Sequence, residues 1–255
     1  FLVALRRALP PGQRLSLTVL PDWLDAPDLR GLLATVDEAV LQLHSLDKPA
    51  RRLFDAAGAR AWTASLARRT DKLFRVALPN YGSRVVLDGQ GRIAAVESEV
   101  PFATGRVGEV PGEGRELFVA PTTVSAFLRW LEKVSPRHLA GVVWFRLPLA
   151  GDQRAWTPAT WRAVVTHRET AVRLTGELQP GDRPGQQVVV LRNQGAMDAT
   201  LPAALIVKAP CLGIAGRNGY VLEREGDDSV FLRGQQALLR AGGEVIVGLA
   251  ECPSG

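Results

Sequence analysis

Four short apolar runs, separated by helix-like segments, constrain the fold of the first two thirds of the chain more than any other feature. Each run has the length of a buried strand. The runs span residues 15–20, 39–44, 74–78 and 139–147. Strands that alternate with helices favour parallel pairing, because each helix returns the chain to the edge of the sheet where the next strand begins. The sequence therefore predicts a parallel sheet whose strands end at a common edge.

The segments between these runs carry helix signals. Apolar residues recur at helical spacing in residues 29–36, 51–69 and 121–134. Another helix is expected to begin at Pro158 with Thr157 as its N-cap, because proline suits the first helical position and threonine suits the cap. One insertion interrupts the pattern: residues 84–97 predict a β-hairpin around the turn at residues 89–91.

The pattern changes near residue 170, where short strand-like segments follow one another without helices. These segments are residues 172–178, 187–191, 203–207, 220–224, 230–232 and 244–249. Glycine-rich stretches between them, residues 213–219 among them, are expected to be turns. The sequence therefore predicts two domains, a first over residues 1–167 that contains the hairpin and an all-β sandwich over residues 168–255.

Alternation along each predicted strand separates an apolar face from a face that carries polar side chains. In the fourth run, Val143 and Phe145 are expected on the apolar face, and Trp144 and Arg146 on the other. An open sheet with helices on both sides would be apolar on both faces, whereas a barrel carries polar side chains inside, near its mouth. The predicted fold class is thus α/β, a partial (β/α) TIM-like barrel followed by a C-terminal all-β sandwich. Four strands do not close such a barrel, so a missing N-terminal segment or a partner chain is expected to complete it.

Two residues at the strand ends are candidates for catalysis. Asp22 follows the first strand and His44 ends the second, so a carboxyl group and an imidazole are expected at the same edge of the sheet. Both groups suit proton transfer. A structural interpretation stays open for each, since Asp22 also suits a helix cap and a single histidine is commonly a structural residue.

Six further residues are candidates for substrate binding: Trp23, Gln42, Tyr81, Glu97, Trp144 and Arg146. The rings of Trp23 and Tyr81 offer flat faces on which a sugar packs. Arg146 faces inward on the fourth strand, where its charge requires a carboxylate or an anionic ligand. Glu97 lies on the hairpin, where we expect it at the rim of the site.

The composition and the motifs disfavour several functional classes. The net charge is +5, but its arginines are scattered rather than gathered into a stripe, so no nucleic-acid partner is expected. The chain contains no phosphate-binding loop and no dinucleotide-binding motif after a strand, and its histidines lack metal-ligand spacing. We therefore expect no cofactor and no metal site. No apolar run approaches the length of a membrane span.

Cys211 and Cys252 are the two cysteines of the chain. They are compatible with one disulfide in an exported protein and equally with two buried thiols, and the sequence leaves this open. We expect export to the periplasm or the medium rather than a cytoplasmic location.

Five segments resemble a family of bacterial proteins that carry a domain of unknown function. They are TVLPDWL (18–24), VDEAVLQLHS (36–45), FRVALPNYGSRVVLD (74–88), AAVESE (94–99) and GVVWFRLPL (141–149). The resemblance covers roughly residues 10–165, and its most specific part is the run from 74 to 88. It implies a glycoside-hydrolase-like barrel with a trailing β-domain. Members of that family also carry an N-terminal barrel half, which is not found in this sequence.

Two functions of different classes remain at this point. The first is a carbohydrate-active protein that binds a saccharide or hydrolyses a glycosidic bond by carboxylic acid–base chemistry, with Asp22 and one further acid. The second is a non-catalytic scaffold or protein-interaction module, in which the strand-end residues contact only one another. Fold-level analogy alone does not separate these two functions.

Overall fold

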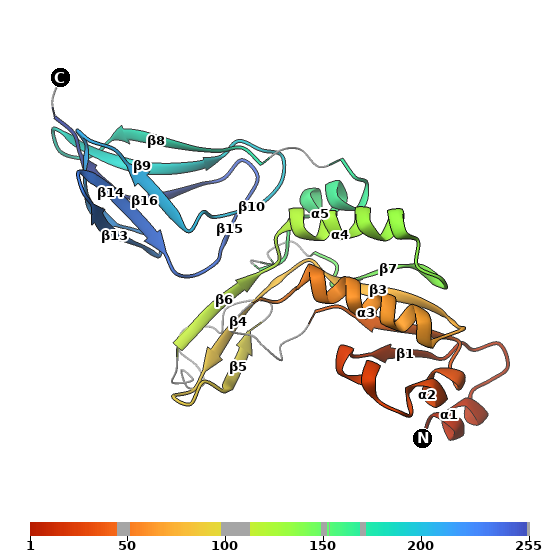
Figure 1. The fold of residues 1–255 in the computed structure, drawn as a ribbon. Helices are drawn as coiled ribbons and strands as arrows, with labels where there is room; N and C mark the ends of the chain where they lie inside the picture. The colour runs from red at the N-terminus through yellow and green to blue at the C-terminus, as the bar shows by residue number, and fades with distance from the viewer. Residues whose placement is uncertain (45–51, 98–112, 149–151, 153, 169–171, 254–255) are drawn as a thin grey trace. The chain divides into compact units, whose positions relative to one another are not determined.

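A computed structural model describes residues 1–44, 52–97, 113–148, 152, 154–168 and 172–253. The chain forms two compact units, each of which draws on separate stretches of sequence (Figure 1). The first unit contains Phe1–Tyr81 and Thr122–Leu147, and the second contains Gly82–Pro121 and Pro148–Gly255.

A parallel sheet of four strands forms the first unit (Figure 1). Its strands, in spatial order, are β1 (Ser16–Val19), β2 (Glu38–Gln42), β3 (Leu73–Pro79) and β7 (Leu139–Phe145). All three neighbouring pairs are parallel. The four strands predicted from the apolar runs, and their parallel pairing, are confirmed.

Helices in the first unit follow the predicted pattern. They are α1 (Leu2–Ala8), the 3-10 helix η1 (Pro21–Asp25), α2 (Leu29–Ala34), α3 (Ala56–Arg69) and α4 (Pro121–Val134). The Asp55 carboxylate accepts a hydrogen bond from the Gly58 amide and so caps α3. Leu33 in α2, Leu66 in α3 and Phe127 in α4 are fully buried. In the described part of the chain, no helix is long and apolar enough to cross a membrane.

One face of the parallel sheet is buried and the other is partly open. Leu41, Phe74 and Leu78 share the buried face and have no exposed surface. On the opposite face, Thr18 of β1 is exposed and Gln42 of β2 is half-buried. The burial pattern of the first three strands agrees with the predicted separation into two faces.

The alternation predicted for the fourth strand is wrong. Phe74 pairs with Leu139 but Arg75 pairs with Gly141, so β7 holds one extra residue at this point. Beyond this bulge, each side chain of β7 lies on the face of the sheet opposite to the one that simple alternation predicts. Trp144 consequently lies beside Leu78 on the buried face, whereas Phe145 lies beside Pro79 on the open face.

The second unit begins with an antiparallel sheet of three strands. They lie in the order β5 (Ile93–Glu97), β4 (Gly82–Leu87) and β6 (Glu113–Phe118). β4 and β5 form the predicted hairpin, with Asp88 accepting hydrogen bonds from the Gln90 and Arg92 amides in its turn. The helix α5 (Pro158–Val165) also belongs to this unit, and Thr157 caps it as predicted.

The rest of the second unit consists of antiparallel strands. A four-stranded sheet has the order β12 (Leu212–Gly216), β16 (Glu244–Glu251), β9 (Gln186–Asn193) and β8 (Leu174–Pro180). A three-stranded sheet has the order β11 (Ala204–Val207), β14 (Asp228–Arg233) and β13 (Tyr220–Glu225), and β10 (Ala199–Thr200) pairs with β15 (Leu238–Leu239). The turn predicted over residues 213–219 is wrong in its first half, because β12 pairs there with β16.

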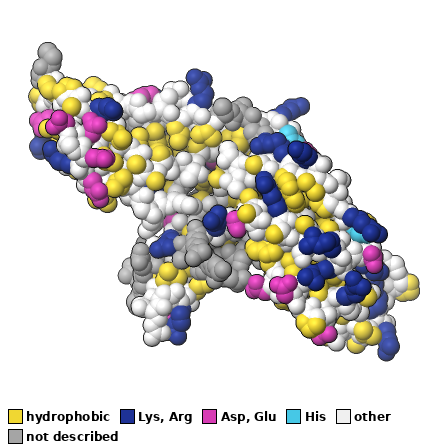
Figure 2. Space-filling view, in the orientation of Figure 1, with side chains coloured by type: hydrophobic (Ala, Val, Ile, Leu, Met, Phe, Trp, Pro, Cys, Tyr) yellow, Lys and Arg dark blue, Asp and Glu magenta, His cyan; other side chains and the backbone are white. Residues whose placement is uncertain are grey.

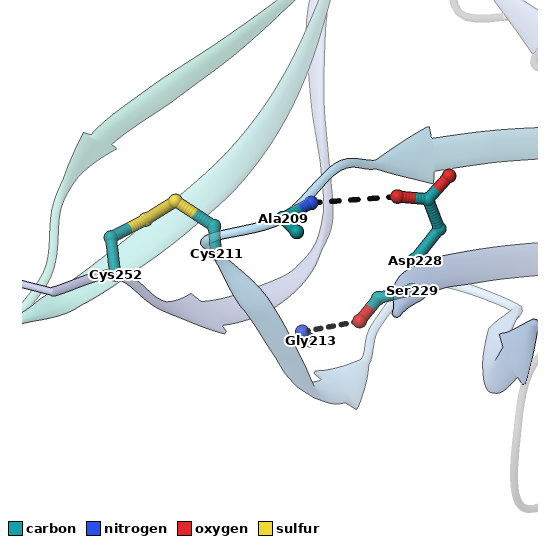
Figure 3. Close-up of a disulfide and its surroundings, with 6 residues drawn as sticks. All are labelled: Ala209, Cys211, Gly213, Asp228, Ser229 and Cys252. Atoms are coloured by element: carbon teal, nitrogen blue, oxygen red, sulfur yellow. Dashed lines mark hydrogen bonds between the residues drawn. A yellow bond between two sulfur atoms is a disulfide. The ribbon is translucent and has the colours of Figure 1, made fainter. Parts of the chain in front are cut away.

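Both larger sheets contribute to one hydrophobic cluster. Leu191 and Val247 come from the four-stranded sheet, and Val207 and Phe231 from the three-stranded sheet. A disulfide joins Cys211, just before β12, to Cys252, just after β16 (Figure 3). Close by, Ser229 of β14 accepts a hydrogen bond from the Gly213 amide at 2.7 Å (Figure 3). The question that the sequence left open about the two cysteines is thus answered by a disulfide.

Candidate functional site

Three aromatic rings and a guanidinium gather where β2, β3 and β7 end. His44 follows β2, Tyr81 follows β3, and Phe145 and Arg146 lie at the end of β7. Carboxyl ends of parallel strands meet at one edge, so side chains far apart in the sequence come together here. We call these four residues the ring cluster.

The rings of the cluster contact one another in pairs. The His44 imidazole stacks on the Phe145 ring with 5.0 Å between centroids, and it meets the Tyr81 ring edge-on at 5.8 Å. The Tyr81 and Phe145 centroids are 5.6 Å apart. His44 and Tyr81 are both 5% exposed, whereas Phe145 is 50% exposed. Phe145 therefore presents a ring to solvent that two buried rings support.

Arg146 and Asn80 hold the strand ends in register. The Arg146 guanidinium lies 5.6 Å from the centroid of the Tyr81 ring, within the range of a cation–π contact. The Arg146 amide donates a hydrogen bond to Oδ1 of Asn80 at 2.9 Å, which satisfies a backbone donor beyond the last paired residue. Asn80 itself is fully buried. Its side chain thus fixes the position of the backbone that carries Phe145 and Arg146.

Burial shifts the pKa values of both His44 and Tyr81 further away from neutral pH, so both side chains are uncharged there. Desolvation lowers the pKa of His44 to about 4, because the charged imidazolium loses its hydration in the buried position. Desolvation raises the pKa of Tyr81 to about 12, and the nearby Arg146 charge opposes this effect only partly. The cluster therefore presents a neutral imidazole, a neutral phenol and one guanidinium.

The Gln42 side chain lies next to the rings at this edge of the sheet, and one nitrogen of the His44 ring has unused hydrogen-bonding capacity. The Gln42 amide donates a hydrogen bond to the His44 carbonyl at 3.1 Å, which places Gln42 beside the imidazole. Among the described residues, Nδ1 of His44 has no hydrogen-bond partner. A buried imidazole nitrogen without a partner is unusual in a purely structural position.

Most residues of the ring cluster were predictable from the sequence. His44, Tyr81 and Arg146 were each predicted as site residues, and the structure brings them together with Gln42 beside them. Phe145 was missed because the predicted alternation assigned it to the covered face. Gly141 was the available signal: a glycine inside a strand marks a bulge, and its φ of +145° suits glycine alone. The same bulge places Trp144 on the buried face beside Leu78, away from the ring cluster.

Asp22 and Trp23 lie on a different element from the ring cluster. Both belong to η1, which follows β1, and Trp23 is 37% exposed. The ring contacts and hydrogen bonds that define the cluster involve neither residue. Their proposed roles stay predictions.

Glu97 belongs to the second unit, where it forms ion pairs. Its carboxylate lies 3.2 Å from the Arg154 guanidinium, which also contacts Glu116 at 2.8 Å. Arg84 approaches Glu97 at 3.6 Å. The hydrogen bond from Arg154 to Glu116 raises the pKa of Arg154 further. Glu97 is 5% exposed and holds the three-stranded sheet to the segment before α5, which is a structural environment rather than an open rim.

Comparisons with known proteins give two family matches. The model described as Domain of unknown function (DUF3142) matches residues 1–150, and the model described as Domain of unknown function (DUF8456) matches residues 176–253. The first match bears out the resemblance to a family of unknown function. The chain has no match among curated proteins.

Two solved structures are similar to the chain. A chitinase, ChiA74, from Bacillus thuringiensis has a TM-score of 0.40 and 9% identity over 98% of this chain and 67% of its own. A family GH18 chitinase from Chromobacterium violaceum has a TM-score of 0.32 and 12% identity over 94% of this chain and 57% of its own. The chain thus spans about two thirds or less of the length of these proteins.

Proposed function

The chain belongs to the DUF3142 family, whose domain has no known function, and from this premise we propose that its ring cluster binds a saccharide. The observation that carries the proposal is the half-exposed Phe145 ring, supported from behind by the buried His44 and Tyr81 rings. A large apolar ring exposed at the ends of parallel strands supports a binding surface, because ligand sites concentrate there. Sugars present flat apolar faces that pack on such rings.

Polar groups around Phe145 match the hydroxyls of a sugar. The half-buried Gln42 carries an amide, and Arg146 carries several N–H donors. Ligand sites typically combine an apolar surface with a few such polar groups. Val143 is 36% exposed on the same strand face as Phe145 and extends the apolar surface.

The proposal includes a wider architecture. We take the parallel sheet as part of a glycoside-hydrolase-like barrel whose inner face carries the ring cluster. The two larger sheets of the second unit, which share one hydrophobic cluster, form a β-sandwich. The Cys211–Cys252 disulfide supports export, because disulfides persist in oxidising compartments.

Phe145→Ala tests the binding site directly. Binding of the full chain to a panel of neutral and uronic-acid oligosaccharides is measured by titration calorimetry. Removal of an aromatic anchor is expected to weaken binding about tenfold or more. Leu73→Ala is the matched control, because Leu73 is also 50% exposed but lies at the opposite end of the same sheet. If no member of the panel binds, or if both variants bind like the wild type, the scaffold function replaces this proposal.

Asp22→Asn separates a hydrolase from a binding protein. A hydrolase that uses Asp22 as acid is expected to lose release of reducing ends while it retains saccharide binding. His44→Gln then tests the second catalytic candidate in the same assay. Binding without any hydrolysis by the wild type would restrict the proposal to saccharide recognition.

A further inference from the structure

A groove lies between α3 and α4 of the first unit, and its lining includes no residue of the ring cluster. It encloses about 590 Å³. Ala64 and Ala67 of α3 line one side, where their small side chains leave room, and Trp130 and Val134 of α4 line the other. The groove is therefore a surface separate from the strand ends at which we place the saccharide.

Trp130 and Val134 give the groove an apolar wall. Val134 is 51% exposed, whereas Val124, Phe127 and Leu131 of the same helix are buried. The Trp130 ring is half-buried and packs on Phe127 with 5.5 Å between centroids. A rigid tryptophan beside an exposed valine is typical of a surface that receives an apolar side chain from a partner.

Cations surround this apolar wall. Arg68 and Arg137 line the groove, and the Arg60 guanidinium lies 5.6 Å from the centroid of the Trp130 ring. Among the described residues of the lining, Asp71 is the single carboxylate. Figure 2 shows dark blue side chains around yellow ones on the part of the surface where Figure 1 draws α3 and α4. The first unit has sixteen Lys and Arg against nine Asp and Glu in its sequence, a net charge of +7, so its wider field has the same sign.

We propose that this groove binds an acidic segment of a partner protein. Carboxylates of the segment pair with Arg68 and Arg137, and one large apolar side chain packs between Trp130 and Val134. Charge complementarity selects this occupant, because a basic or neutral segment would leave the guanidinium groups at the rim without anionic partners. An amphipathic helix in a groove between two helices is a common form of such recognition.

A peptide-display selection on the full chain tests the proposal. Random twelve-residue peptides are selected on the wild-type protein, and the Kd of the enriched peptides is measured by fluorescence polarisation. The expected peptides combine several Asp or Glu with one large apolar residue, and their binding weakens with added salt. Arg68→Glu is expected to raise their Kd about fivefold or more, because it replaces an attraction by a repulsion.

Arg30→Glu is the matched control, because Arg30 is exposed on α2 and its substitution changes the net charge equally. Val134→Ala, at a position exposed enough to preserve the fold, is expected to weaken binding as well. Equal Kd values for the Arg68→Glu and Arg30→Glu variants would overturn the proposal, as would a selection that enriches no acidic peptide. A wild-type dimer in light scattering that Arg68→Glu dissociates would assign the groove to a second copy of the chain instead.

Discussion

The two units of this protein differ in sheet type, in charge and in what their buried polar groups do. The first unit has a parallel sheet and a net charge of +7, and the second has antiparallel sheets with fifteen Lys and Arg against seventeen Asp and Glu, a net charge of −2. Parallel strands bring their carboxyl ends to one edge, which is where the ring cluster lies. Neighbouring antiparallel strands place their carboxyl ends at opposite edges of a sheet. The buried polar side chains of the second unit, such as Glu97 and Asp198, pair with other elements of that unit.

The two units also differ in how a buried polar side chain is hydrogen-bonded, as Asp198 and His44 illustrate. The Asp198 carboxylate, with no exposed surface, accepts hydrogen bonds from the Thr157 amide at 2.7 Å and from Arg240 and the Ala241 amide, each at 3.2 Å. In contrast, Nδ1 of the buried His44 has no partner among the described residues. A fully partnered carboxylate indicates a structural role, whereas a buried nitrogen with unused hydrogen-bonding capacity is unusual in such a role.

The largest expected effect follows from removal of the disulfide. Replacement of Cys211 and Cys252 by serine is expected to cost the second unit about 4 kcal/mol, because the bond closes a loop of 41 residues in the unfolded chain. Hydrogen exchange read peptide by peptide during urea unfolding measures the effect on each unit. Equal loss of protection in the first unit would contradict the separation of the two units.

Asp198→Ala is expected to destabilise the second unit by about 3 kcal/mol, because it removes the acceptor of the Thr157 and Ala241 amides and the carboxylate that pairs with Arg240. The urea midpoint of the same unit measures this loss. Asp182→Ala is the control, since Asp182 is exposed. A loss below about 1 kcal/mol would show that solvent replaces the carboxylate and that Asp198 contributes little to joining these elements.

Acidification is expected to weaken the first unit through His44. The folded-state pKa of about 4 lies below the ordinary value of 6.5, so the unfolded chain binds the proton more readily between these values. Stability is therefore full above pH 6.5 and falls as the pH decreases towards 4. The expected loss between pH 8 and pH 5 is about 2 kcal/mol.

Urea unfolding of the wild type and of His44→Gln, each at pH 8 and at pH 5, tests whether His44 causes this loss of stability. The variant is expected to lose the part of the pH dependence that comes from the imidazole, whereas dependence from carboxylates remains in both proteins. An unchanged pH profile would show that His44 is hydrated or partnered in solution.

The smallest effects on stability are expected from removal of one helix cap in each unit. Asp55→Ala removes the side-chain cap of α3, and Thr157→Ala removes that of α5. Each is expected to cost about 1 kcal/mol, with Thr157→Ala the larger of the two because Thr157 Oγ1 also donates to Asp198. Thermal unfolding of each variant, beside the exposed Thr123→Ala control, measures the difference. A larger cost for Asp55→Ala would reverse the expected order.

Local sequence patterns determined much of the fold. The four apolar runs became the strands of the parallel sheet, the spacing of residues 121–134 became α4, and Thr157 with Pro158 began α5. These features depend on residues that are neighbours in the sequence, because periodicity and capping act over one or two turns or a single strand. The positions of His44 and Tyr81 at the strand ends followed from the same patterns.

Only the tertiary structure decided how distant residues meet. The bulge in β7 moved Phe145 onto the open face and Trp144 away from it, and register depends on the neighbouring strand rather than on β7 alone. Asn80 receives a hydrogen bond from a residue 66 positions away, and Glu97 pairs with an arginine 57 positions away. The sequence supplied these polar groups, but their partners follow from the packing of whole elements, which local periodicity does not encode.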